Sequence, residues 1–217
     1  GNTVSDHNST APIVIVGAGL GGLAAAIALR HRGHHAIVVD KTRELGEVGG
    51  PLGISPPTLR LFDEWGMLEK FNQISSATGY FETHDQDGHV ESVTDYAAAP
   101  EQGSEHGRFG YADAELSPRT VHRADLHALM VAHLGRDRVR LRHRLTGLVE
   151  HDEHVALTFA DGTDLQAPLV IGADGLRSTV RRLSLTNPGT TLITSFALCA
   201  LSGLIRLSFI CSRVRVG

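Results

Sequence analysis

Three glycines and one acidic residue form the pattern in this sequence that could do chemistry. Gly17, Gly19 and Gly22 have the spacing G-x-G-x-x-G, and they come directly after the apolar run Ile13–Val16. Glycines at this spacing allow a tight turn, a close approach of phosphate to the backbone, and close packing of a helix on a strand. Asp40 ends a second apolar run, where an acid can accept a hydrogen bond from a ribose hydroxyl. The pattern predicts a dinucleotide site, and it leaves open whether the dinucleotide is FAD or NAD(P).

Two strands and a helix must position these residues. Ile13–Val16 is β-branched and apolar, as expected for a strand buried on both faces. Leu23–Arg32 is rich in Ala and Leu and predicts a helix, and Ala36–Val39 predicts the next strand. The start of the helix would offer free N–H groups and the positive end of its dipole to phosphate. The competing interpretation is a strand-helix-strand unit in which the glycine-rich turn is incidental.

Composition excludes several classes of function. A chain of 217 residues fits one large domain or one and a half typical ones. The net charge of −4 argues against a general nucleic-acid binder, and aromatic residues at 5% argue against a base-stacking surface. The two cysteines, Cys199 and Cys211, cannot build a disulfide framework, and the 13 histidines show no metal-ligand spacing. We therefore expect no metal site and a cytoplasmic location.

The segment Arg43–Gly66 is expected to contain a loop and then a helix. Its first half is rich in Gly and Pro, which predicts a loop. Gly49, Gly50 and Gly53 would let that loop lie close to a ligand, although a simple connector is equally open. Ser55–Thr58 can start an amphipathic helix. The predicted buried side of this helix is Leu59, Leu61, Phe62 and Trp65.

The middle of the chain predicts a hairpin, a loop and a second helix. Tyr80–Thr83 is strand-like, and Asp87-Gly88 is a hairpin turn signal. Asp95–Thr120 has no periodicity and predicts a long surface loop.

Val121–Leu134 has apolar residues at helical spacing and predicts a helix with Arg123 in its first turn. An arginine there opposes the helix dipole unless it faces an anion. A solvated surface arginine is the alternative.

The later part of the chain predicts more strands and a second glycine-rich loop. The predicted strands are Val139–Val149, Val155–Phe159 with a turn at Asp161-Gly162, and Leu169–Ile171. The last strand runs into a loop that contains Asp174 and Gly175.

Four segments in series resemble the FAD-dependent monooxygenases of the p-hydroxybenzoate and salicylate hydroxylase type (class A). They read GAGLGGLAAAIALRHRGHHAIVVDK, GEVGGPLGISPPTLRLFDEWGML, VHRADLHALM and DLQAPLVIGADGLRSTVRR. The resemblance covers about Pro12 to Leu183. It implies an α/β fold, namely a Rossmann-like FAD-binding domain of the GR2-type flavoprotein fold, with an incomplete β-rich substrate domain.

The resemblance also implies roles for individual residues. The glycines of the first loop would hold the FAD pyrophosphate, Asp40 the adenosine ribose, and the Gly49–Gly50 loop would pass close to the flavin. Arg123 would reach the phosphate or ribityl region, and Asp174 would lie near the pyrophosphate. Asp174 in a tight Asp-Gly turn without such a role is the alternative. The implied cofactor-binding residues are Gly17, Gly19, Leu20, Gly22, Asp40, Lys41, Gly49, Gly50, Gly53, Arg123, Asp174 and Gly175. No catalytic residue is assigned.

The sequence departs from the family pattern at three positions. The family often has Glu where Asp40 stands. Pro51 and Pro57 each remove a backbone N–H donor near the expected flavin side.

The activity implied by the resemblance is hydroxylation. NAD(P)H would reduce FAD, and one oxygen atom of O₂ would pass to an aromatic or polyketide-like small molecule, in a role such as secondary metabolism. One alternative is a truncated, non-catalytic remnant that binds FAD weakly or not at all. The other is a flavin-dependent reductase or dehydrogenase of the same superfamily.

The C-terminal segment differs in character from the rest. The expected organisation is a flexible tail at 1–11, an FAD-binding domain at 12–184 with an inserted part of the substrate domain at about 75–120, and a hydrophobic tail outside the family pattern at 185–217. Three interpretations of this tail compete. The first is a gene-model artefact that replaces the true continuation. The second is a membrane anchor over about 192–210, and the third is a core element of a compact variant. The apolar run 192–205 is short for a membrane span.

Overall fold

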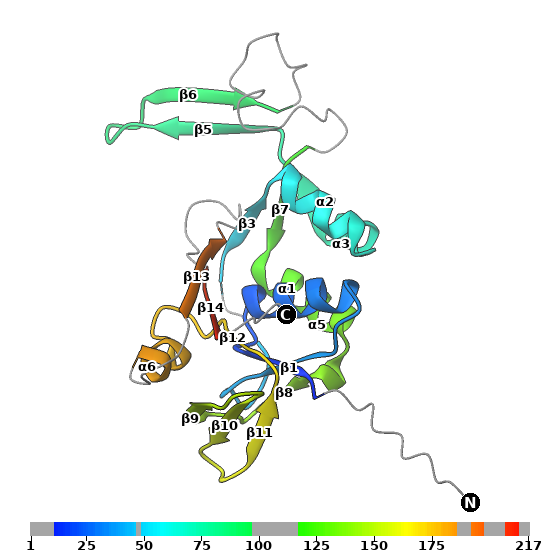
Figure 1. The fold of residues 1–217 in the computed structure, drawn as a ribbon. Coiled ribbons are helices and arrows are strands. Elements are labelled where there is room, and N and C mark those ends of the chain that lie inside the picture. Colours follow the sequence, from blue (N-terminus) through cyan, green and yellow to red (C-terminus); the bar gives the residue numbers. More distant parts are fainter. Residues whose placement is uncertain (1–10, 47–48, 97–116, 186–191, 198–206, 213–217) are drawn as a thin grey trace, which may run out of the picture. The chain divides into compact units, whose positions relative to one another are not determined.

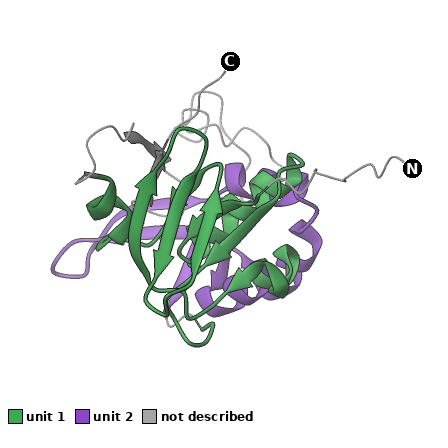
Figure 2. Ribbon diagram, turned by 60° about the horizontal axis from the view of Figure 1, so that its bottom comes forward, with its two compact units in different colours: residues 1–46, 130–197, 206–217 green, residues 47–129, 198–205 purple. Residues whose placement is uncertain are grey.

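The computed structural model describes residues 11–46, 49–96, 117–185, 192–197 and 207–212. The chain divides into two compact units, coloured in Figure 2. Unit 1 comprises residues 1–46, 130–197 and 206–217, and unit 2 comprises residues 47–129 and 198–205. Unit 2 is larger than the insert at about 75–120 that the sequence predicts.

Unit 1 is organised around a six-stranded sheet with the order β13-β14-β12-β1-β2-β8 (Figure 1). The strands β12, β1, β2 and β8 are parallel to one another, β14 pairs antiparallel with β12, and β13 pairs antiparallel with β14. The four parallel neighbours are β1 (Ile13–Val16), β2 (Ala36–Val39), β8 (Val139–Arg140) and β12 (Val170–Gly172), and the two strands beyond β12 are β14 (Leu207–Ser212) and β13 (Leu192–Ala197). The predicted Rossmann-like core is confirmed.

The apolar runs form this sheet because both of its faces are covered. Helix α1 (Leu20–His31) contacts β1 and β2, and its Leu23 is fully buried. Val14 and Ile37 belong to a core cluster on the opposite face, together with side chains of a second, antiparallel sheet. This second sheet has the order β11-β10-β9, with β9 (Leu145–Glu150), β10 (Val155–Phe159) and β11 (Asp164–Ala167). Helix α6 (Thr179–Leu185) adds Val180 to the same core.

The continuous strand predicted over Val139–Val149 is wrong. The chain leaves the parallel sheet after Arg140, turns through residues 141–144, and enters the antiparallel sheet at Leu145. Arg142 has a φ of 62°, in the left-handed region that few residues other than glycine adopt.

Unit 2 contains a three-stranded antiparallel sheet and two short helices. The sheet has the order β3-β7-β4, with β3 (Pro51–Ile54), β7 (Arg119–His122) and β4 (Ser75–Ala77). Helices α2 (Pro56–Glu64) and α3 (Leu68–Ile74) bury Phe62 against Phe71, with ring centroids 5.0 Å apart. Helix α5 (Arg123–Leu134) begins directly after β7.

Unit 2 corrects several sequence-based expectations. Residues 51–54 form strand β3 and not a loop, because their backbone pairs with β7. Pro51 fits there because it is the first residue of the strand. Strand β7 takes up Val121 and His122, so the predicted helix starts two residues later than expected, at Arg123. Leu61 is 39% exposed and does not belong to the buried side of α2. Of the long loop expected over 95–120, residues 97–116 lie outside the described residues.

No helix in the described part of the chain is both long and apolar enough to cross a membrane.

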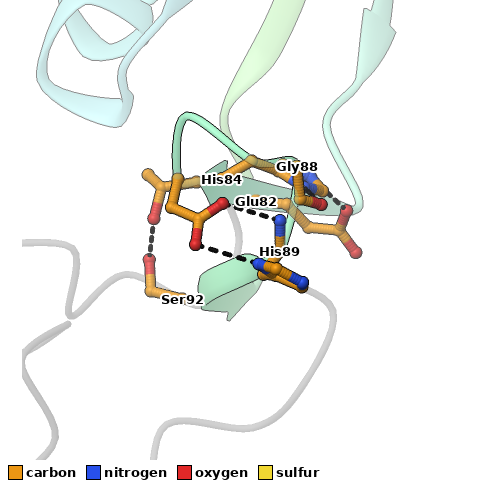
Figure 3. Close-up of polar contacts among 7 residues, drawn as sticks. Glu82, His84, Gly88, His89 and Ser92 are labelled. Carbon is orange, nitrogen blue, oxygen red and sulfur yellow. Dashed lines mark hydrogen bonds and ion pairs between the residues drawn. The ribbon is translucent and has the colours of Figure 1, made fainter.

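Strands β5 (Tyr80–His84) and β6 (Val90–Asp95) form the predicted two-stranded hairpin. Figure 3 shows that polar contacts organise its turn. The Asp85 carboxylate accepts hydrogen bonds from the backbone N–H groups of Asp87 (2.9 Å) and His89 (2.8 Å). Nε2 of His84 lies 3.1 Å from the Glu82 carboxylate, and its Nδ1 lies 3.2 Å from the Gly88 carbonyl oxygen. Ligand atoms of Asp85, Asp87 and His89 also lie within 4.8 Å of one another, but the turn itself explains this nearness and we assign no metal to it.

The hairpin turn is expected to be most ordered in mildly acidic solution. The Gly88 carbonyl and the Glu82 carboxylate raise the pKa of His84, and hydrogen bonds from His89 lower the pKa of Asp85. The His84 contacts therefore stabilise the turn fully below about pH 6.5 and weaken as the pH rises through the raised pKa. The Asp85 contacts are present above about pH 4 and weaken as the pH falls through the lowered pKa.

An NMR titration of the histidine ring signals checks this expectation. The midpoint for His84 should lie above about 6.5, and Glu82→Gln should bring it closer to that value. A His84 midpoint at or below about 6.5 in the unsubstituted chain would contradict the contacts seen at the turn.

Candidate nucleotide-binding site

The carboxyl ends of three parallel strands meet at one edge of the unit 1 sheet. Gly17 follows β1, Asp40 follows β2, and Asp174 lies two residues beyond β12. Strand β1 lies between β2 and β12 in the sheet. The loop after β2 and the loop after β12 therefore leave the sheet on opposite sides of β1. In open sheets of this kind, ligands bind in the crevice outside the carboxyl ends at such a point. The fold therefore brings together residues that are far apart in the sequence and that we predicted separately.

Gly17 and Gly22 are needed because backbone lies against them. Gly17 has a φ of +114°, and a Cβ placed on it would lie 2.3 Å from the carbonyl oxygen of Ala173. A Cβ on Gly22 would lie 1.8 Å from the carbonyl oxygen of Gly17. Neither position tolerates a side chain without a shift of main chain. The glycine loop is thus packed between α1 and the loop that follows β12.

The start of α1 is suited to an anion. Gly19 is its N-cap residue with extended backbone, Leu20 is its first residue, and no side chain caps it. The first turn also has no acidic residue. The free N–H groups and the helix dipole at this end favour a negatively charged group such as a phosphate. The predicted phosphate-binding role of Gly17, Gly19, Leu20 and Gly22 stays a prediction, and this geometry fits it.

The Asp40 carboxylate ties the glycine loop to the end of β2. One oxygen accepts a hydrogen bond from the backbone N–H of Ala18 at 2.7 Å, and the other accepts one from Thr42 at 2.8 Å. Each carboxylate oxygen has a second lone pair, so Asp40 retains the capacity to accept a hydrogen bond from a ribose hydroxyl. The sequence pattern predicted that hydroxyl contact, but it gave no sign of the bond to the loop.

The Asp174 carboxylate holds the start of helix α6. It accepts a hydrogen bond from the hydroxyl of Ser178 at 2.5 Å, and bonds from the backbone N–H groups of Thr179 and Val180 at 2.6 and 3.2 Å. Gly175 follows with a φ of +83°. These contacts cap α6, and the alternative foreseen for Asp174, a carboxylate in a tight Asp-Gly turn, stays a prediction. A contact with pyrophosphate remains a prediction.

A cavity of about 310 Å³ lies among these elements, all within unit 1. This volume is near the lower end for small-molecule sites. It includes four of the residues predicted from the sequence, namely Gly17, Asp40, Lys41 and Asp174. Its whole lining is Val16, Gly17, Asp40, Lys41, His143, Arg144, Leu145, Thr146, Asp174, Thr179 and Arg182. The basic side chains of this lining suit a ligand that carries phosphate.

Sequence reasoning missed part of this lining. His143 and Arg144 come from the turn that was predicted as strand, Thr146 comes from β9, and Arg182 comes from α6, for which no helix was predicted. A signal was present, because four of the five residues 140–144 are Arg or His, where a strand buried on both faces would be apolar throughout.

Unit 2 holds the remaining predicted residues. Gly53 lies in β3 opposite Thr120, and Gly50 is exposed with open space around its Cα. A Cβ on Gly49 would lie 2.7 Å from Cδ of Arg123, so these two residues are in contact. Arg123 is the first residue of α5, as predicted for the first turn. Their role toward a flavin stays a prediction.

Gly49→Ala is expected to destabilise the chain by about 1 kcal/mol, because the Arg123 side chain must move aside to accept the methyl group. Gly50→Ala is the matched control, since its Cβ would meet no atom within 4 Å, and it should change stability by less than about 0.5 kcal/mol. Urea unfolding of the two variants measures the difference. Equal stability of both variants would show that the Gly49 contact has no energetic weight.

Comparison with known proteins gives consistent matches. A family model described as FAD binding domain matches residues 10–204. Hispidin-3-hydroxylase of Neonothopanus nambi is 36% identical over 194 residues, which cover 84% of this chain and 42% of that protein. The 6-hydroxynicotinate 3-monooxygenase of Bordetella bronchiseptica is 31% identical over 169 residues, covering 78% of this chain and 42% of that protein. The chain thus spans about two fifths of the length of these curated relatives.

Solved structures agree in fold. Klebsiella pneumoniae HpxO, in complex with FAD and uric acid, has a TM-score of 0.64 and 26% identity, over 85% of this chain and 44% of that one. The p-nitrophenol 4-monooxygenase PnpA of Pseudomonas putida has a TM-score of 0.67 and 21% identity, over 86% of this chain and 45% of that one.

Proposed function

The chain belongs to the FAD binding domain family. On that premise we propose that it functions as an FAD-dependent monooxygenase, which hydroxylates an aromatic small molecule with NAD(P)H and O₂. The observation that carries the proposal is the uncapped start of α1 beside the cavity at Gly17 and Asp40. The family match confirms the resemblance to flavin-dependent hydroxylases that the four sequence segments indicated.

The residues of unit 1 fit the adenosine diphosphate half of FAD. The N–H groups at the start of α1 would bind the pyrophosphate, and no side chain competes with it there. Asp40 would accept a hydrogen bond from a ribose hydroxyl, because its two hydrogen bonds to backbone N–H groups leave other lone pairs of the carboxylate unused. Lys41, Arg144 and Arg182 line the same cavity and would offset the charge of the phosphates.

When bound, FAD supplies hydride acceptance from NAD(P)H and activation of O₂, chemistry that amino-acid side chains do not provide. The contribution of this chain is to bind the cofactor and fix its orientation. Gly49, Gly50, Gly53 and Arg123 in unit 2 are proposed to act toward the flavin end.

An aromatic substrate is proposed by analogy with the relatives. Their names describe hydroxylation of hispidin, of 6-hydroxynicotinate and, for a 27% identical protein of Pseudomonas putida, of salicylate. All three are small aromatic or unsaturated ring compounds that already carry a hydroxyl group. Electron-rich rings of this class are therefore the substrates to test first.

The test has two stages. The purified chain is incubated with FAD and freed of excess, and bound oxidised flavin is measured by its absorbance near about 450 nm. NAD(P)H oxidation is then followed with a panel of hydroxylated aromatic acids, and products are analysed by mass. The expected result is substrate-stimulated NAD(P)H oxidation and a product that has gained one oxygen atom.

Other outcomes separate the alternatives. A product that differs from the substrate only in its number of hydrogen atoms would indicate a reductase or dehydrogenase. If the chain binds flavin but oxidises NAD(P)H with no substrate of the panel, the monooxygenase proposal for this chain is overturned. If it binds no flavin, a non-catalytic remnant is indicated.

A further inference from the structure

The turn at residues 141–144 is built against the end of β2. Arg142 adopts its left-handed backbone there and is the one residue other than glycine with positive φ among those the structure describes. Such a conformation costs about 1 kcal/mol or more, and it persists where the surrounding structure fixes it. The fixing contacts are two backbone hydrogen bonds of 2.8 Å, from Arg142 N–H to the Thr42 carbonyl and from His143 N–H to the Asp40 carbonyl. The turn is therefore held to the same segment that carries the predicted ribose ligand.

This arrangement places His143 in the lining of the nucleotide cavity. Its ring packs against Phe159, with centroids 5.0 Å apart and an interplanar angle of 78°. Phe159 is itself almost fully buried in the core of unit 1, so it gives the imidazole a rigid support. The position of the ring is thus fixed by the backbone on one side and by the core on the other.

The hydrogen bonding of the ring fixes its tautomer. Nδ1 of His143 lies 2.6 Å from the carbonyl oxygen of Leu141. A carbonyl oxygen can only accept, so Nδ1 must carry the proton in this contact. The neutral ring consequently presents Nε2 as a hydrogen-bond acceptor. His143 is the one imidazole in this lining, whose other polar side chains are carboxylates, hydroxyls and cations.

We infer that His143 is a specificity residue of the nucleotide cavity, whose Nε2 accepts a hydrogen bond from a donor group of the bound adenosine. The inference rests on the proposed FAD site and extends it to a residue outside the glycine loop and the acid after β2. Adenosine offers two kinds of donor, the exocyclic amino group of the base and the hydroxyl groups of the ribose. Cations in the lining recognise the phosphates, whereas a fixed neutral acceptor recognises the nucleoside.

The test measures ADP binding to the 217-residue chain by calorimetry, in the absence of FAD. His143→Phe keeps a ring that can pack on Phe159 but has no acceptor, and it should bind ADP about fivefold to tenfold more weakly. His143→Gln, which retains an acceptor oxygen, should recover part of the loss. His151→Phe is the matched control, because His151 is exposed and lies outside the cavity lining. It should bind ADP as the unsubstituted chain does.

Analogues of ADP identify the donor. Inosine diphosphate lacks the amino group, and 2′-deoxy-ADP and 3′-deoxy-ADP each lack one ribose hydroxyl. The analogue that lacks the donor should bind the unsubstituted chain and His143→Phe equally well. For each nucleotide, the loss is the ratio of its affinity for the unsubstituted chain to its affinity for His143→Phe. If this loss is the same for all three analogues as for ADP, the hydrogen bond is not the cause and the inference is overturned.

Two further outcomes separate this inference from the proposed function. Equal ADP affinity of the unsubstituted chain and His143→Phe overturns the inference alone. A chain that binds neither FAD nor ADP overturns the proposed function and the inference with it. Thermal unfolding of each ligand-free variant ensures that folded chains are compared. If His143→Phe does not fold, His143→Leu, which also has no acceptor, takes its place in the analogue series.

Discussion

Gly22→Ala is expected to lower the free energy of unfolding by about 3 kcal/mol or more, and to abolish retention of FAD. The new methyl carbon would stand 1.8 Å from the carbonyl oxygen of Gly17. That atom is main chain, so it cannot rotate away, and α1 must separate from the glycine loop. Such a separation moves the N–H groups of the helix start away from the position proposed for the pyrophosphate. Since many domains have only about 5–15 kcal/mol of stability, the variant should also melt at a clearly lower temperature.

Gly46→Ala is the matched control for this substitution. A Cβ on Gly46 meets no atom within 4 Å, and the residue belongs to the same unit. Thermal unfolding and flavin absorbance after gel filtration measure both variants side by side. Retention of FAD by Gly22→Ala at the level of Gly46→Ala would show that the close packing of α1 on the glycine loop is unnecessary for binding.

Asp174→Ala is expected to cost about 2–3 kcal/mol of stability even without any nucleotide present. The substitution leaves the hydroxyl of Ser178 and the N–H groups of Thr179 and Val180 without their common acceptor. The start of α6 should then fray, and Val180 should lose its fixed place in the core of unit 1. The reason for a large effect is that one carboxylate serves three donors at a partly buried helix start.

Asp161→Ala is the control for the loss of a turn carboxylate. Asp161 accepts hydrogen bonds from the N–H and the hydroxyl of Thr163, but on an exposed turn. The loss of stability there should be smaller than about 1 kcal/mol. Urea unfolding of the ligand-free chains makes the comparison. If Asp174→Ala weakens FAD binding and leaves the ligand-free stability unchanged, Asp174 acts on the cofactor and its capping role has no energetic weight.

The sequence allowed both strands of the first βαβ unit to be predicted with their bounds, whereas helix α1 begins at Leu20, three residues before the predicted start at Leu23. Strand, glycine loop, helix and second strand each have a strong local pattern, and the local patterns agree with the tertiary contacts of Ile13–Val39. The same holds for the β5–β6 hairpin, where the Asp87-Gly88 turn signal lies between two strand-like runs. In these places the information that fixes the structure is contained in short stretches of chain.

The parts that could not be predicted depend on partners far away in the sequence. Residues 51–54 look like a glycine- and proline-rich loop, and they become strand β3 because β7 pairs with them. The turn at residues 141–144 lies between β8 and β9, and it exists because the Thr42 and Asp40 carbonyls accept hydrogen bonds from its N–H groups. Likewise, the atoms that Asp40 and Asp174 bind could not be inferred, since side-chain partners are set by how loops fold back. The candidate site was therefore predicted on its glycine side and missed on its histidine and arginine side.

The division of unit 1 into separate chain segments has a consequence for synthesis of the protein. Strand β1 pairs with β12, so that Val14 lies beside Val170. The cavity takes its walls from residues as early as Val16 and as late as Arg182. It cannot close on a growing chain until the last of these has left the ribosome, whereas residues 47–129 of unit 2 form a continuous stretch. Contacts so distant in sequence fold slowly. We therefore expect the capture of nucleotide to come late in folding, and we expect the bound cofactor to hold together segments of unit 1 that are far apart in the sequence.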